Sequence, residues 1–201
     1  MLGFLRGAKR FGDPVIVVSG LPRSGTSMMM RMLEAGGVEI MTDGEREADV
    51  DNPKGYYEIE RIKNLEKETD KSYLREARGK AVKVISFLLQ FLPSDNRYQI
   101  IFMRRDLDEV LTSQNKMIAH RGSKDTTCDE DMKESYRNDI ARVRLLCRKK
   151  ANIELCEVTY RDTVNDPAVT AAHVAKFLGR DLDVTAMAQA VDPNLYRNRK
   201  A

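Results

Sequence analysis

The sequence has few of the residues that build metal centres and disulfide frameworks. Its 201 residues include three cysteines, at irregular spacing, and two histidines. An odd number of cysteines without a repeated spacing predicts reduced thiols rather than a disulfide framework or a zinc site. Two histidines are likewise too few for a histidine-based metal site. We therefore expect a function that needs no protein-bound metal.

Long apolar runs and a strong charge of one sign are also missing. No stretch approaches the roughly 18 apolar residues of a membrane-spanning helix. The apolar start of the chain is too short for a signal peptide, which makes the cytoplasm the expected compartment. A formal net charge of +3 does not argue for nucleic acid, but it is compatible with a small anionic ligand. We expect neither a membrane nor a nucleic acid as partner.

Short apolar segments alternate with longer amphipathic ones. The expected strands are Val15–Ser19, Ala81–Ser86, Gln99–Met103 and, nearer an edge, Ile153–Tyr160. The expected helices are Thr26–Glu34, Tyr57–Glu68, Leu107–His120, Asp129–Lys150, Pro167–Leu178 and Thr185–Ala190. This alternation predicts one α/β domain over 1–201, a three-layer sandwich with a mainly parallel sheet and a core at about 14–179. Ligands of such sheets bind at the carboxyl ends of the strands.

The segment VIVVSGLPRSGTSM joins the first strand to the first helix through a phosphate-binding frame. Gly20 and Gly25 give the G-x-x-x-x-G spacing that turns backbone N–H groups toward an anion at a helix N-terminus. Thr26 and Ser27 stand where a nucleoside triphosphatase has lysine and a hydroxyl residue, which weakens the case for Mg-dependent phosphoryl transfer. The cation is Arg23, inside the loop. The alternative interpretation is a glycine-rich turn with an exposed arginine.

A second basic segment, IIFMRRDLDEVLTS, follows the third expected strand. Arg105 stands at the strand end and Ser113 lies eight residues later, about two turns into the next helix. Both are expected to face the crevice beside the first loop, where an arginine and a hydroxyl suit a second phosphate. Taken alone, the segment also fits a solvated basic turn and a serine on the helix surface.

Together the two segments resemble the sulfotransferases that use 3′-phosphoadenosine 5′-phosphosulfate, bacterial members in particular. The resemblance implies that Arg105 and Ser113 hold the 3′-phosphate. It implies that Arg23 stabilises the charge on the bridging oxygen as the sulfuryl group leaves, giving adenosine 3′,5′-bisphosphate without a metal. The residues assigned to the 5′-phosphosulfate are Pro22, Arg23, Ser24, Gly25, Thr26 and Ser27.

Further stretches are similar to bacterial members of that family, and some family features are missing. DNPKGYYE at 51–58, VKVISFLLQFLP at 82–93 and the YRDTVNDP and FLG patterns within 160–179 carry the similarity. The chain has no tryptophan after the first loop and lacks the Arg-Lys-Gly run of many members. The basic residues of YRNRK are either a substitute for that run or a basic tail; they are Arg197, Arg199 and Lys200.

Sulfuryl transfer to an alcohol or amine requires a group that accepts a proton. In protein-tyrosine sulfotransferases, a glutamate lies about twenty residues after the loop arginine. By this resemblance, the expected proton acceptor is Glu45 or Asp43. Glu58 is the third candidate. His120 and His173 are poorly placed along the chain. A further cation, Lys83, either contacts the sulfate or acceptor or simply ends its strand.

Three functions stay open on the sequence. The first is a sulfotransferase acting on a hydroxyl or amine of a small-molecule, carbohydrate or peptide acceptor, with segments 36–80 and 114–135 expected to form the acceptor site. The second is a P-loop kinase of a nucleotide or small molecule. The third is a nucleotide-binding module without catalytic activity. Nothing in the sequence indicates an oligomeric state.

Overall fold

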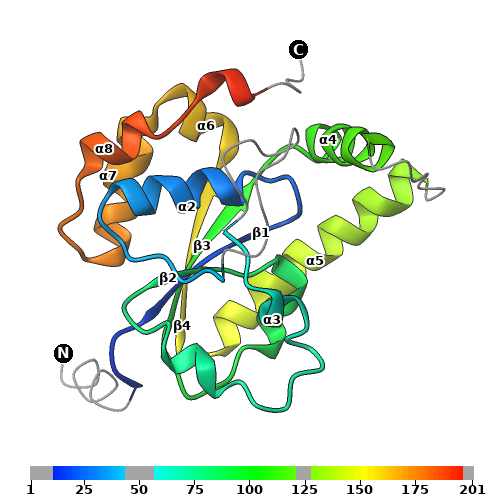
Figure 1. The fold of residues 1–201 in the computed structure, drawn as a ribbon. Helices are drawn as coiled ribbons and strands as arrows, with labels where there is room; N and C mark the ends of the chain where they lie inside the picture. The colour runs from blue at the N-terminus through cyan, green and yellow to red at the C-terminus, as the bar shows by residue number, and fades with distance from the viewer. Residues whose placement is uncertain (1–10, 44–56, 121–127, 197–201) are drawn as a thin grey trace.

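The computed structural model describes residues 11–43, 57–120 and 128–196, which fold into a sheet covered by helices (Figure 1). In this part of the chain the sheet has four strands in the order β2-β1-β3-β4, and every neighbouring pair is parallel. The strands are β1 (Val15–Gly20), β2 (Ala81–Lys83), β3 (Tyr98–Arg104) and β4 (Ile153–Thr159). The α/β class and the edge position of the last strand are therefore confirmed.

Most helices follow the expected pattern with small changes at their ends, but α6 was not predicted and begins at Tyr160, where the last strand was expected to end. The predicted bounds of α4 and α7 are met, and the ends of α2, α5 and α8 differ by one residue. A left-handed Gly179 ends α7, and Asp166 caps its start by accepting from Val169 N at 3.0 Å. The helices are α2 (Thr26–Ala35), α4 (Leu107–His120), α5 (Asp129–Lys149), α6 (Tyr160–Asn165), α7 (Pro167–Leu178) and α8 (Val184–Gln189).

Two predicted elements are wrong in extent. The expected helix over Tyr57–Glu68 is reduced to the single turn of α3 (Glu60–Lys63), since Tyr57 has a φ of +52° and cannot begin a right-handed helix. The expected strand Ala81–Ser86 ends at Lys83, because β2 pairs with only three residues of β1. The chain then continues into the 3₁₀ segment η2 (Ser86–Phe91). Two more such segments are η1 (Ser72–Arg75) and η3 (Pro193–Leu195).

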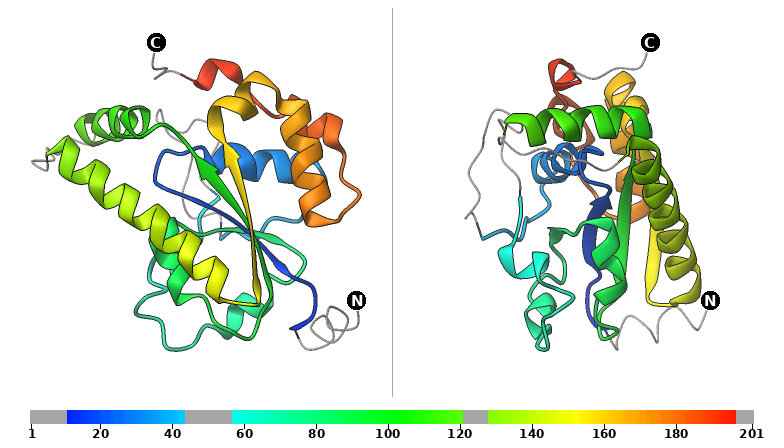
Figure 2. Two further views of the ribbon diagram at one scale, coloured as in Figure 1. Left: turned by 180° about the vertical axis from the view of Figure 1, so that it is seen from behind. Right: turned by 90° about the vertical axis from the view of Figure 1, so that its right-hand side faces the viewer.

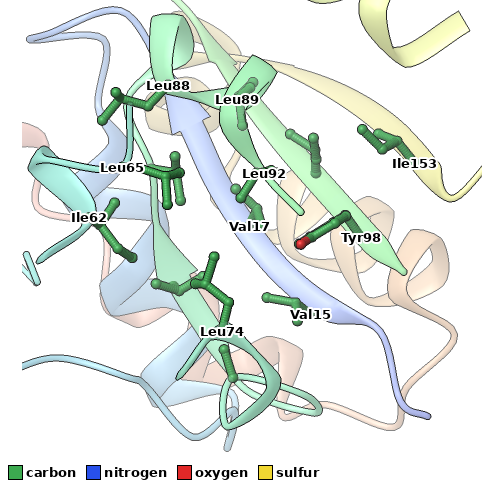
Figure 3. Close-up of a cluster of buried hydrophobic side chains, with 14 of the residues drawn as sticks. Val15, Val17, Ile62, Leu65, Leu74, Leu88, Leu89, Leu92, Tyr98 and Ile153 are labelled. Carbon is green, nitrogen blue, oxygen red and sulfur yellow. The ribbon is translucent and has the colours of Figure 1, made fainter. Parts of the chain in front are cut away.

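Side chains of β1 alternate between two hydrophobic cores, one on each face of the sheet. Val15 and Val17 belong to the core covered by α3, α5, η1 and η2, part of which is drawn in Figure 3. Ile16 and Val18 belong to the core covered by α2, α7 and α8. The central strand is apolar on both sides because both of its faces are buried. This is the three-layer arrangement expected from the sequence.

The carboxyl ends of the strands lie together at one end of the molecule. Register pairs Gly20 with Met103 and Arg104 with Thr159, so the segments that follow β1, β3 and β4 leave the sheet side by side. Helix α4 lies beyond this end of the sheet in both views of Figure 2. Among the described residues, no helix is long and apolar enough to span a membrane, and no cluster of three metal-ligating side chains occurs.

Candidate functional site

The loop between β1 and α2 has a tightly constrained backbone. Gly25 has a φ of +102°, and a Cβ there would lie 2.3 Å from the Tyr160 ring. Gly20 has a φ of +152°, and a Cβ there would lie 2.4 Å from Ser24 Oγ. Arg23 has a φ of +65°, a left-handed conformation that few residues other than glycine adopt and that is typical of functional loops. The two glycines of the frame are thus required by close packing.

Polar groups of this loop are positioned for an anion. Ser24 is 1% exposed, and among the described residues its Oγ has no hydrogen-bond partner. No described side chain caps the N-terminus of α2, and its first turn holds no acidic residue. The first N–H groups of a helix have no intrahelical acceptor and carry partial positive charge. An anion at this point would therefore satisfy several donors at once.

Three segments meet at Arg23. Its Nε donates a hydrogen bond to Ser113 Oγ on α4 at 3.0 Å. Its carbonyl oxygen accepts a hydrogen bond from Arg105 Nη1, at the end of β3, at 3.1 Å. The structure thus brings both residues of the second basic segment to the loop, although they lie more than eighty positions away in the sequence.

Arg105 is buried in a network that the sequence did not indicate. Its side chain is 7% exposed, and its Nε donates to Glu109 Oε2 at 3.0 Å, four residues along the chain. The guanidinium lies over two tyrosine rings, 4.4 Å from the centroid of Tyr160 and 5.3 Å from that of Tyr196. Its Nη2 is buried and has no hydrogen-bond partner among the described residues. The Nη2 amino group of Arg105 thus remains for a ligand.

The carboxylate of Glu109 holds this network together. It is 2% exposed and accepts from Tyr196 Oη at 2.8 Å through Oε1. Arg161 Nη2 lies 3.4 Å from the same oxygen. Burial is the main cause that raises the pKa of Tyr160, so this ring stays neutral beside Arg105. A buried carboxylate with cationic and hydroxyl partners fixes Arg105 against the strand ends.

A second ionic cluster lies on the other side of the loop. Lys83 Nζ, at the end of β2, lies 3.2 Å from Glu58 Oε1 and 3.4 Å from Ser27 Oγ. The Lys83 and Glu58 side chains are 8% and 14% exposed. Lys63 Nζ lies 3.2 Å from the other carboxylate oxygen of Glu58. Two ammonium groups thus fix the position of the Glu58 side chain near the helix that follows the loop.

The three carboxylates proposed as proton acceptors differ in their surroundings. Asp43 Oδ2 accepts from the backbone N–H of Glu60 at 2.5 Å, which stabilises the start of α3. Asp43 is thus engaged in a structural contact, whereas Glu58 contacts Lys83, which in turn contacts Ser27. Glu45 lies outside the described residues, as do the tail residues Arg197, Arg199 and Lys200.

The two histidines lie away from these clusters. His120 is the exposed last residue of α4. His173 is exposed on α7, with Nε2 at 3.2 Å from Cys156 Sγ. Burial raises the pKa of the Cys156 thiol to about 11, which keeps it protonated and unreactive at neutral pH.

Sequence reasoning missed two parts of this site. No sequence pattern predicts that Lys83 pairs with Glu58. The sequence indicated each residue separately, and the two lie on different segments of the chain. Arg105 and Glu109 are four residues apart, but Arg105 precedes α4, so helical spacing does not account for their contact. Tyr160 and Tyr196 come from the C-terminal third of the chain, and only the fold joins them to Arg105.

Residues 80–184 match a family model described as "Sulfotransferase family". The matched segment begins just before β2 and ends at the start of α8. It includes Arg105, Glu109, Ser113 and Tyr160, whereas Tyr196 and the loop after β1 lie outside it. No protein of curated function matches the chain.

Several solved sulfotransferase structures have a similar fold. The sulfotransferase domain of the Synechococcus PCC 7002 olefin synthase is 18% identical with a TM-score of 0.60, over 96% of this chain and 90% of that one. The sulfotransferase domain from the curacin biosynthetic pathway is 12% identical with a TM-score of 0.56, over 90% and 79%. Sulfotransferase STF1 from Mycobacterium tuberculosis H37Rv is 16% identical with a TM-score of 0.55, over 94% and 73%. At these identities the likeness concerns the fold.

Proposed function

The chain belongs to the sulfotransferase family, and we propose that it transfers a sulfuryl group from 3′-phosphoadenosine 5′-phosphosulfate to a hydroxyl or amine. The observation that carries this proposal is the contact of Arg23 with Ser113 across two strand ends. That contact joins the loop suited to one phosphate to the helix suited to another. A donor with separate 5′ and 3′ anionic groups fits such a pair better than a triphosphate does.

The 5′ end of the donor fits the first loop by its unsatisfied groups. Ser24 Oγ is buried without a hydrogen-bond partner among the described residues, and the α2 N-terminus has no described side-chain cap. Gly25 leaves space where a Cβ would meet the Tyr160 ring. Pro22, Thr26 and Ser27 complete the cradle. The loop supplies N–H groups and hydroxyls in place of a lysine after the second glycine.

The 3′-phosphate fits between Arg105 and Ser113. Arg105 Nη2 is buried and has no described partner, so it is the donor aimed at this anion. Its orientation is set by Glu109 and by the Tyr160 ring. Because Arg105 is held before any ligand arrives, little side-chain entropy is lost when the phosphate binds.

The bound donor supplies a sulfuryl group whose sulfur bonds to the acceptor oxygen or nitrogen while the bond to the 5′-phosphate oxygen breaks and leaves its electron pair on that oxygen. Arg23 and Lys83 provide positive charge at the loop where this negative charge develops. Fixed cations and helix N–H groups at such a point stabilise the transition state more than water does. Ser113 orients Arg23 through the hydrogen bond to its Nε.

Glu58 is the proton acceptor in this proposal. It contacts Lys83, which in turn contacts Ser27 of the loop, so the carboxylate is one side chain away from the phosphosulfate cradle. Its two carboxylate oxygens lie 3.2 Å from Lys63 Nζ and 3.2 Å from Lys83 Nζ, which fixes the position of the proposed base. Asp43 is the weaker candidate because it stabilises the start of α3. Glu45 stays a prediction.

A labelled-donor assay tests this function. The chain is incubated with sulfur-labelled donor and a panel of phenols, sugars and amines, and both labelled product and adenosine 3′,5′-bisphosphate are measured. The proposal predicts transfer to at least one acceptor without added metal, and its loss in Glu58→Gln. If the chain binds the donor but transfers the label to no acceptor class, and if Glu58→Gln leaves donor binding unchanged, the chain is a non-catalytic nucleotide-binding module instead.

A further inference from the structure

An open cavity of about 630 Å³ lies between the first loop, η2 and helix α5. Its volume is in the range of sites that bind small organic ligands. Leu21 and Pro22 line it from the loop, and Ser86 and Phe87 line it from η2. Helix α5, which runs beside η2 in Figure 1, forms the remaining wall. The expected acceptor segment 114–135 contributes Asp131, Glu134 and Ser135, whereas the described residues of segment 36–80 contribute none.

This cavity adjoins the groups assigned to sulfuryl transfer. Pro22 in its wall directly precedes Arg23. Tyr136 on α5 also lines it, and its Oη donates to Gln114 Oε1 at 2.5 Å, next to Ser113 in the chain. The walls of the cavity are therefore joined to both partners of the Arg23–Ser113 contact. A molecule bound here would lie beside the donor loop.

The polar lining of the cavity is predominantly acidic. Helix α5 contributes the carboxylates of Asp131, Glu134 and Asp139, and among the described lining residues Arg142 is the basic one. Such a surface attracts cations and disfavours acceptors that carry carboxylate, sulfate or phosphate groups.

Asp139 is the carboxylate of this lining that is held in a fixed position. Its Oδ2 accepts from Ser86 Oγ at 2.5 Å, which fixes the carboxylate between η2 and α5. Its Oδ1 is buried and has no hydrogen-bond partner among the described residues, and Arg142 Nη1 lies 4.0 Å away. A buried carboxylate oxygen without a donor is costly, so a ligand N–H group would stabilise this site.

We infer that the cavity binds the acceptor and that this acceptor is a cationic amino alcohol with an apolar body. The inference rests on the proposed sulfotransferase function. The ammonium group donates to Asp139 and is attracted by Glu134 and Asp131. The hydrocarbon body packs on Leu21 and on Phe87, whose side chain is otherwise 46% exposed.

The acidic wall also decides which group of the acceptor reacts. An ammonium group held at Asp139 has no lone pair and cannot attack sulfur, so the hydroxyl at the other end is the nucleophile. Its oxygen bonds to sulfur, the bond from sulfur to the 5′-phosphate oxygen breaks, and the hydroxyl proton passes to Glu58. The products are a sulfate ester, adenosine 3′,5′-bisphosphate and one proton.

Three phenols of similar shape and different charge test this inference: tyramine, para-ethylphenol and para-hydroxyphenylpropionate. Transfer of labelled sulfate gives kcat/KM for each, after calorimetry has established binding of adenosine 3′,5′-bisphosphate. We expect tyramine to exceed the neutral phenol by roughly tenfold, and the anionic phenol to be slowest. Asp139→Asn should remove most of the tyramine preference and leave para-ethylphenol within about twofold.

Two further variants keep the test decisive. Glu134→Gln lies on the exposed wall and should reduce the tyramine preference even if Asp139→Asn folds poorly. Glu130→Gln is the matched control, because Glu130 is on the same helix outside the cavity and pairs with Arg137. Equal measurable rates for the three phenols, a preference that survives both variants, or no transfer to tyramine by a chain that transfers to another acceptor overturns the inference alone. Failure to bind the bisphosphate overturns the proposed function as well.

Discussion

Arg23 Nε donates a hydrogen bond to Ser113 Oγ over 3.0 Å, although ninety positions separate the two residues in the sequence. The contact joins the loop after β1 to the helix after β3. It brings together the two segments that sequence analysis assigned to different phosphates of one donor. Arg23 is the cation inside the loop, and Ser113 positions its guanidinium. The proposed chemistry therefore depends on this contact.

Arg23→Ala should lower kcat for sulfuryl transfer by roughly 100-fold, because a fixed cation is removed from the point where negative charge develops. Arg23→Lys should recover part of this loss, since it restores the charge without the planar guanidinium.

Ser113→Ala should weaken adenosine 3′,5′-bisphosphate binding and leave 5′-AMP binding unchanged. Steady-state kinetics and calorimetry measure these effects. Equal weakening of both nucleotides by Ser113→Ala would contradict the assignment of Ser113.

Arg105→Ala should reduce affinity for adenosine 3′,5′-bisphosphate by at least roughly tenfold while sparing 5′-AMP. It should also destabilise the fold by about 3 kcal/mol, since Glu109 is then left as a buried carboxylate without its main partner. Urea unfolding and calorimetry separate the two effects. Arg104→Ala is the control, because Arg104 pairs with Glu157 and should leave nucleotide binding intact. Parallel losses for both nucleotides in Arg105→Ala would argue against a 3′-phosphate contact.

Glu58→Gln should lower kcat by roughly 100-fold with little change in bisphosphate affinity, as expected for loss of a proton acceptor. Asp43→Asn should retain turnover and lower the unfolding midpoint slightly, because Asp43 supports the start of α3. Single-turnover rates and thermal melts of both variants make the comparison. Normal turnover in Glu58→Gln would move the role of base to Glu45 or to another residue.

Gly25→Ala should destabilise the protein by about 3 kcal/mol and abolish donor binding, since the added Cβ meets the Tyr160 ring and the backbone is left-handed. Gly37→Ala is a matched control, with a φ of +91° and no described atom within 4 Å of the added Cβ. It should cost only the backbone term, about 1 kcal/mol. Denaturant unfolding compares the two. Similar losses in both would show that the Tyr160 contact carries no energy.

The sequence predicted the layers of the fold well, because strands β1 and β3 are buried on both faces and helices α2, α4 and α7 end within one residue of the predicted bounds. Asp166, Pro167 and Gly179 define α7 by local signals, and the structure keeps those bounds. The failures lie where tertiary contacts decide. Residues 57–68 have helical amphipathicity, yet the left-handed Tyr57 and the Asp43 contact leave only α3.

Much less of the candidate site could be predicted. The loop and the Arg105–Ser113 spacing are local patterns, so sequence alone identifies them. The partners of Arg105 are Glu109 and two tyrosines more than fifty positions away, and no periodicity connects them. Likewise, the cavity wall combines Leu21 with residues of α5, and only the packing of η2 against that helix brings them together.

Calorimetric titration of the chain with adenosine 3′,5′-bisphosphate and with ATP, both in the presence of Mg²⁺, tests the central claim most directly. The account predicts saturable binding of the bisphosphate and little binding of ATP, because Arg105 and Ser113 recognise a 3′-phosphate and the loop lacks a lysine for a triphosphate. Tight binding of ATP without binding of the bisphosphate would contradict it and would favour a P-loop kinase.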